Sequence, residues 1–165
     1  MTVFARRPIV CADIYRQIAV NPVVHTFRPI SPNDEAALVA FHERCGAETR
    51  YLRFAAAKPQ LHPGEARYLC AVDDHHRGAL VLVDAEDPAT IHGVGRWERI
   101  SVSDAELAFA VEDAYQGKGL GRKLIEATIE RAREEGFSRL VTDILPSNHR
   151  MRRLARYYGL LIAEL

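Results

Sequence analysis

The 165-residue chain predicts an α/β protein with a mixed sheet, folded as a single domain. Two observations lead to this prediction. Apolar residues recur with the spacing of strands in some segments and with the spacing of helices in others. Beyond the middle of the chain, a glycine-rich turn joins an apolar strand over residues 105–111 to a helix that ends at Gly136. No internal repeat or interdomain linker interrupts the alternation.

The first half of the chain predicts one strand, a set of helices and a hairpin. Residues 24–30 have the pattern of a strand. The segment Ser31–Asp34, which contains a proline, is typical of a helix start, and Leu38 and Phe41 give the next helix an apolar face. The remaining elements predicted here are helical stretches through Tyr51–Phe54 and about residues 65–72, and a hairpin of residues 78–83 and 90–97.

The second half of the chain predicts two further pairs of a strand and a helix. The strand over residues 105–111 leads through the turn into the helix that ends at Gly136. A strand over residues 137–145 follows, and a last helix runs from Asn148 to Gly159. Asn148 is a residue type that commonly caps a helix, so the last helix has a clear start.

The turn Gln116–Gly121 is the most informative stretch of the chain. A glycine-rich turn that opens a helix leaves several backbone N–H groups without partners, and the helix dipole adds attraction for an anion. The turn therefore predicts a pyrophosphate site. It is neither a P-loop, which needs Ser or Thr after Gly-Lys, nor the Gly-x-Gly-x-x-Gly dinucleotide motif. Lys118, Arg122 and Lys123 lie beside the turn, where they would either pair with phosphate groups or be merely solvated.

Charge and cysteine content exclude several classes of protein. The chain has 22 Lys and Arg against 22 Asp and Glu, so we expect no nucleic-acid and no membrane partner from bulk electrostatics. Cys11, Cys45 and Cys70 lack metal-ligand spacing and predict the reduced thiols of a cytoplasmic protein. The seven histidines also lack such spacing, so no metal is expected.

The Gln-x-x-Gly-x-Gly pattern after a strand that ends in Val111 resembles the acetyl-CoA loop of the GNAT N-acetyltransferases. The strand over residues 137–145 and the helix from Asn148 resemble the same superfamily, in the same order. The resemblance implies acetyl-CoA as the cofactor, and a GNAT domain over residues 23–165 that follows an N-terminal extension, 1–22. The cofactor-binding residues that it implies are Phe109, Ala110, Val111, Gln116, Gly117, Lys118, Gly119, Leu120, Gly121, Arg122 and Asn148.

The N-terminal half of the chain indicates which subfamily of the GNAT acetyltransferases this sequence resembles. Glu48–Phe54 is similar to the segment that forms the helices beside the acceptor groove in bacterial Pat-type protein lysine acetyltransferases, although the same residues also suit a plain apolar helix face. This resemblance implies transfer of an acetyl group to an amine acceptor, in particular a protein lysine. Two alternatives stay open: N-acetylation of a small-molecule amine, and a catalytically silent module that senses acyl-CoA.

Acetyl transfer to an amine needs a general base, because an ammonium group has no lone pair. Glu106 is the strongest candidate, since it is an acid in an otherwise apolar strand, where burial would raise its pKa toward a useful range. It also matches the position of the Pat-type catalytic glutamate. The alternative is a solvent-facing strand residue, because Asp104, Glu106 and Ala108 share one face. Asp104 and Glu112 are weaker candidates for the base.

The usual general acid of the GNAT family is absent from its expected position. In the family, this acid is a Tyr seven residues after the Asn that starts the last helix. In this chain, Ala155 occupies that position. Pat-type sequences share this departure. Tyr158 lies one helical turn further on and is the second catalytic candidate, as the acid that protonates the CoA thiolate. Alternatively, Tyr157 and Tyr158 pack the helix against the sheet.

The C-terminus predicts a shortened form of the GNAT C-terminal hairpin. Only Leu160–Leu165 follows the last helix, which is enough for one short strand. Such a strand would have an open apolar edge, which soluble proteins seldom leave bare. We expect the N-terminal segment or the same strand of a second subunit to cover this edge, and the second case would make the protein a homodimer.

Overall fold

The computed structural model describes residues 18–20 and 23–163, and these residues form one sheet flanked by helices. In chain order the elements are β1 (Ile18–Val20), β2 (Val23–Pro29), η1 (Pro32–Asp34), α1 (Glu35–Arg44), α2 (Ala47–Phe54), α3 (Pro63–Cys70), β3 (Arg77–Asp84), β4 (Ile91–Arg99), β5 (Asp104–Val111), η2 (Asp113–Tyr115), α4 (Leu120–Glu134), β6 (Arg139–Asp143), α5 (His149–Tyr157) and β7 (Leu161–Ala163).

The seven strands follow one another in the sheet in chain order, from β1 at one edge to β7 at the other. The strands from β1 to β5 pair antiparallel, whereas β6 is parallel to β5 and β7 is parallel to β6. Parallel neighbours need a crossover connection, and α4 and α5 supply the two crossovers. The predicted α/β class and mixed sheet are confirmed.

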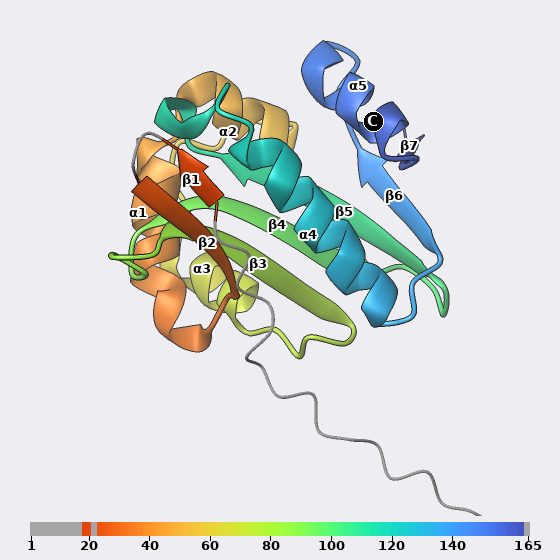
Figure 1. Cartoon of the computed structure of the whole chain (residues 1–165), viewed down its shortest axis with the longest axis horizontal. Helices are drawn as coiled ribbons and strands as arrows, with labels where there is room; N and C mark the ends of the chain where they lie inside the picture. Colours follow the sequence, from red (N-terminus) through yellow and green to blue (C-terminus); the bar gives the residue numbers. More distant parts are fainter. Residues whose placement is uncertain (1–17, 21–22, 164–165) are drawn as a thin grey trace, which may run out of the picture.

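Helices cover both faces of the sheet. Figure 1 shows α4 lying across one face, while α1, α2 and α3 lie on the other. Side chains alternate accordingly along β3, where Leu80 and Leu82 join the core under α4 and Val81 and Val83 join the core under α1 and α3. Each face of the sheet therefore has its own apolar core.

The close approach of α4 to the sheet requires a glycine on β4. A Cβ atom placed at Gly95 would lie 2.2 Å from the Oγ1 atom of Thr128. Thr128 is fully buried, and its hydroxyl donates to the Leu124 carbonyl within the helix. Since any larger residue at Gly95 would displace α4, this contact fixes the helix that begins at the glycine-rich turn.

Most predicted elements are confirmed, two differ in extent, and one was not predicted. The strand predicted over residues 137–145 is shorter, Arg139–Asp143, because Phe137 precedes the sheet pairing as a buried core residue. The third helix starts at Pro63, since proline suits the first helical turn. The strand β1 was absent from the prediction, because three residues are too few to show an alternating pattern.

The two edges of the sheet lie at opposite ends of the strand order. Ile18–Val20 pairs with β2 at one edge, and Leu161–Ala163 pairs with β6 at the other. The prediction that the N-terminal segment covers the second edge falls mainly on residues 1–17, which lie outside the described residues. Among the helices of the described ranges, none has the length and apolarity that crossing a bilayer requires.

Candidate active site

The strands β5 and β6 pair only at their first residues and then separate. Their parallel register ends where Glu106 lies opposite Val141, whereas β5 continues to Val111. Figure 1 shows β6 starting beside β5 and then diverging from it toward α5. Beyond Glu106, the backbone N–H and C=O groups on this side of β5 have no strand partner among the described residues. An extended ligand arm can take the place of the missing strand.

The turn after β5 presents backbone amides at the end of this opening. Gly117 and Gly119 have φ angles of 75° and 82°, and Gly119 is the N-cap of α4. Within the described part of the chain, no backbone carbonyl accepts a hydrogen bond from the amides of residues 117–122. A Cβ atom at either glycine would meet nothing within 4 Å. Free amides at a helix N-terminus are suited to binding a pyrophosphate.

The structure brings the predicted cofactor-binding residues of β5, the turn and the first turn of α4 together around the opening. Leu120 is fully buried beneath the turn, so only its backbone faces a ligand. Lys118 and Arg122 are exposed, and their cationic groups lie 5.3 Å and 5.1 Å from the ring centres of Tyr115 and Tyr157. Their pairing with phosphate groups stays a prediction.

The side chain of Gln116 stabilises the turn through hydrogen bonds to its neighbours. Its side-chain amide donates to the carbonyl of Val111 over 2.9 Å and to the hydroxyl of Thr49 over 3.1 Å. The Nη1 atom of Arg150, on α5, lies 3.4 Å from the Gln116 Oε1 atom and donates to it. One glutamine side chain therefore connects β5, α2 and α5 around the turn.

Asn148 caps α5 on the far side of the opening. Its Oδ1 atom accepts a hydrogen bond from the amide of Met151 over 3.1 Å. The predicted capping role is confirmed. A contact between the Asn148 amide and the cofactor arm stays a prediction.

Asp113 ties the same region to the start of α2. Its carboxylate accepts from the Gly46 amide over 2.7 Å and from the Thr49 hydroxyl over 3.0 Å. Gly46 is the N-cap of α2, so the carboxylate of Asp113 supplies the cap that glycine lacks. The position of α2 therefore depends on the segment that carries the turn.

Replacing Asp113 with alanine should destabilise the protein by about 1 kcal/mol, because α2 loses its cap. Urea unfolding would measure this change. Asp113→Asn is the matched control, since it keeps one acceptor oxygen and should lose less. Equal stability of the alanine variant and the parent protein would contradict the capping role.

Glu106 lies on the face of β5 that is turned toward α1, α2 and α3. The antiparallel register places it opposite Glu98 of β4. Partial burial and the negative charges of Asp143 and Glu98 raise the pKa of Glu106, while the Arg53 guanidinium opposes the rise. The side chain as a whole is exposed, so an acceptor can reach it. A reachable carboxylate with a raised pKa is suited to act as a general base.

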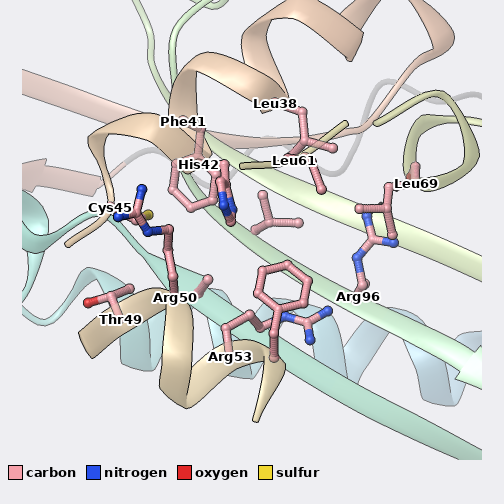
Figure 2. Close-up of a pocket in the computed structure, with 13 residues that line it drawn as sticks. Leu38, Phe41, His42, Cys45, Thr49, Arg50, Arg53, Leu61, Leu69 and Arg96 are labelled. Atoms are coloured by element: carbon pink, nitrogen blue, oxygen red, sulfur yellow. Dashed lines mark hydrogen bonds between the residues drawn. The ribbon is translucent and has the colours of Figure 1, made fainter. Parts of the chain in front are cut away.

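A cavity of about 40 Å³ opens on the same face of the sheet, between α1, α2 and the strands β4 and β5. Figure 2 shows Arg50 on one side of it and Arg96 on the other, with Arg53 between them on α2. Cys45 also lines the cavity, but burial raises the pKa of its thiol to about 12. The thiol is therefore protonated at neutral pH and is a poor nucleophile.

Tyr158 contacts α4. Its hydroxyl donates to the Glu126 carboxylate over 2.9 Å, and its ring packs edge-on against that of Tyr157. Burial, together with the hydrogen bond to Glu126, raises the pKa of Tyr158. This contact connects α5 to α4, and a role for the hydroxyl as general acid stays a prediction.

The variant Tyr158→Phe separates the two roles of this hydroxyl. We expect a loss of about 1 kcal/mol in stability, because one hydrogen bond to a charged group disappears, and a change in kcat of less than about threefold. Thermal unfolding and steady-state turnover would measure the two effects. A large fall in kcat at unchanged stability would assign the acid role to Tyr158 and contradict our expectation.

Several residues around the site were assigned no role from the sequence. Thr49, Asp113 and Arg150 meet Gln116 or its neighbours only through the folded chain, over separations of 34 to 67 residues. Arg53 and Arg96 likewise join the cavity from α2 and β4. These residues become neighbours only in the folded chain, so their proximity could not be predicted without the order of the strands in the sheet.

Comparisons with known proteins agree with this geometry. The model of the Acetyltransferase (GNAT) family matches residues 47–160. The acetyltransferase Pat of Mycolicibacterium smegmatis is 33% identical over 143 residues, which cover 80% of this chain and 40% of that protein. An acetyltransferase of Pseudomonas aeruginosa is 28% identical over 134 residues, which cover 80% of this chain and 72% of the relative.

Among solved structures, the crystal structure of the GNAT domain of PAT from S. lividans superposes with a TM-score of 0.82. It is 28% identical, and the match covers 90% of this chain and 88% of that domain. The chain spans less than half the length of the mycobacterial Pat that it matches. The match of the family model over more than half of the chain shows that this protein belongs to the GNAT family of acetyltransferases, which use acetyl-CoA as the acyl donor.

Proposed function

We propose that this protein transfers the acetyl group of acetyl-CoA to the amino group of a protein lysine, with Glu106 as the general base. The observation that carries the proposal is the position of Glu106. It is the last residue of β5 that pairs with β6, and its face of the sheet also holds the cavity. A carboxylate at this point lies between the opening for the cofactor and the space for an acceptor.

Different residues around the opening bind the cofactor and accept the proton of the acceptor. Bound acetyl-CoA supplies the acetyl group as a thioester. The amides of residues 117–122 hold its pyrophosphate, and the unpaired edge of β5 beyond Glu106 aligns its arm. The Glu106 carboxylate takes a proton from the acceptor ammonium, which leaves the amine a lone pair with which to attack. As the C–N bond forms and the C–S bond breaks, the amine loses its second proton to the departing thiolate or to water, so this scheme needs no separate acid group.

Two observations support a protein lysine as the acceptor. The named relative with 33% identity is an acetyltransferase of the Pat type, as Glu48–Phe54 also suggests. The side chain of Glu106 is exposed on its face of the sheet, so a lysine carried on a protein surface can reach it. The free thiols of Cys45 and Cys70 are in keeping with action in the cytoplasm.

Incubation with a cell lysate and acetyl-CoA labelled in its acetyl group tests the proposal. We expect label in proteins, at lysine residues identified by mass spectrometry, and far less label with Glu106→Gln. Label confined to small molecules would make the protein a small-molecule N-acetyltransferase. No transfer, together with tight CoA binding, would make it a sensor.

We also propose limits for the domain and an arrangement at its exposed edge strand. We place the GNAT domain at residues 23–165 and propose that either the N-terminal segment or β7 of a second subunit covers the outer edge of β7, the second case making a homodimer. Among the described strands, β7 pairs with β6 alone. Light scattering at a defined concentration would measure the mass, and a monomer would contradict the homodimer.

A further inference from the structure

Three arginine side chains line the cavity beside the candidate base. Arg50 and Arg53 come from successive turns of α2, and Arg96 comes from β4. All three are half-buried. Their only hydrogen bonds among the described residues go to backbone carbonyls: Arg50 donates to Pro59 over 3.3 Å, and Arg96 donates to Leu69 over 3.1 Å.

None of these three arginines has an ion-pair partner within 4 Å in the part of the chain that the structure describes. Other arginines of this fold do pair with carboxylates. Arg28 lies 2.7 Å from Asp34, and Arg44 lies 3.2 Å from Glu112. The fold thus neutralises arginines elsewhere but leaves three guanidinium groups unpaired around one cavity.

The charge of Arg96 is affected by its positive neighbours. Burial, together with the positive charges of Arg53 and Arg77, lowers the pKa of Arg96 to about 10. The Nε atom of Arg50 is buried and has no hydrogen-bond partner. A buried donor without a partner is unfavourable, and so are half-buried like charges that no carboxylate pairs within 4 Å, so the cavity favours an anion.

The cavity lies next to the base along the strands. Arg96 is opposite Ala108 in the register of β4 and β5, and Glu106 is the next residue of β5 on the same face. Arg53 is close enough to Glu106 to interact with its charge. An anion held near Arg53 and Arg96 would therefore lie close to an amine that reaches Glu106.

We propose that the arginine-lined cavity is a carboxylate subsite, which selects acceptor lysines that lie beside an aspartate or glutamate. This inference rests on the proposed function. Guanidinium groups bind carboxylates through paired N–H donors, and three of them line this one cavity. The arginine charges also favour loss of a proton from a nearby ammonium, which assists Glu106.

Two pairs of acceptors test this specificity. The first pair is a peptide with Lys next to Glu and the same peptide with Gln in place of Glu. The second pair is 6-aminohexanoate and hexylamine, which differ by one carboxylate and represent a small-molecule source of the same group. We expect kcat/KM for the Glu peptide to exceed that for the Gln peptide by at least about tenfold.

The variants Arg50→Gln and Arg96→Gln should each lose most of this preference while binding CoA normally. Arg67→Gln is the matched control, because Arg67 is exposed on α3 and should leave the preference unchanged. A ratio near one in the parent protein, or a preference that survives both variants, would overturn the proposal. A preference seen only for 6-aminohexanoate would keep the subsite and reject a protein acceptor.

The proposed subsite can be tested separately from acetyl transfer. If neither peptide is acetylated, the proposed function fails, and the anisotropy of the fluorescently labelled peptides still measures their binding in the presence of CoA. Tighter binding of the Glu peptide that Arg50→Gln or Arg96→Gln abolishes would support the subsite. Equal binding of the two peptides would overturn it.

Discussion

Replacing Glu106 with glutamine is expected to lower kcat by about 10²–10⁴-fold at neutral pH and to leave the affinity for CoA unchanged. Glutamine has the shape of glutamate but cannot accept the proton of the acceptor ammonium. The pyrophosphate turn lies at the other end of β5, so its amides are unaffected. Steady-state turnover and calorimetric titration with CoA would measure the two quantities.

The same variant should not be less stable at neutral pH. Burial raises the pKa of Glu106 in the folded state, so the folded protein holds this proton more tightly than the unfolded chain does. The stability that this group contributes is therefore present at low pH and is lost as the pH rises through the raised pKa. Glutamine does not ionise, so the variant avoids this loss of stability. Above this pH we expect the Tm of the variant to equal or exceed that of the parent protein.

Glu98→Gln is the matched control for Glu106→Gln. Glu98 lies opposite Glu106 on the same face of the sheet, and its charge contributes to the raised pKa of Glu106. Its removal should lower that pKa slightly and leave kcat near the parent value at neutral pH. Unchanged turnover in Glu106→Gln, or an equal loss in both variants, would move the base elsewhere, with Asp104 or a bound water next.

The variants Gly119→Asp and Gly121→Glu should each abolish CoA binding. Both add a negative charge at the start of α4, where the free amides and the helix dipole favour an anion. Gly119 also has a φ of 82°, a conformation that a residue with a Cβ atom adopts only with strain. Titration calorimetry with CoA would report the loss, and Lys118→Ala should weaken binding far less.

Gly64→Asp serves as the control for these substitutions. Gly64 lies in the first turn of α3, has no positive φ and has nothing within 4 Å of an added Cβ atom. An aspartate there should leave CoA binding intact. Normal CoA binding in both Gly119→Asp and Gly121→Glu would show that the turn is not the pyrophosphate site.

Much of the fold could be predicted because its signals are local. The strand 105–111, the glycine-rich turn and the helix to Gly136 form one continuous segment, and each part is defined by residues within a few positions of one another. The cap at Asn148 could be predicted for the same reason. The strand β1 has three residues, too few for a periodic pattern to distinguish it from a loop, whereas the short strand β7 lies within the predicted Leu160–Leu165.

The site was predictable only in part, since half of its residues come from distant segments. The pyrophosphate turn and Glu106 are contiguous with one strand, so the sequence indicated both. The cavity needs α2 to pack against β4 and β5, which brings Arg50 and Arg53 to Arg96. No local pattern encodes this packing. The resemblance of Glu48–Phe54 indicated that Arg50 and Arg53 lie beside the acceptor groove, but the sequence assigned no role to either of them or to Arg96.

The pH dependence of kcat/KM tests most directly the claim that Glu106 takes a proton from a lysine acceptor. For the parent protein with a lysine peptide, the rate should level off above the pKa of Glu106, which lies above the ordinary 4.5. For Glu106→Gln, the rate should instead climb about tenfold per pH unit up to the pKa of the acceptor amine. Two profiles of the same shape would contradict the role of Glu106 as the general base.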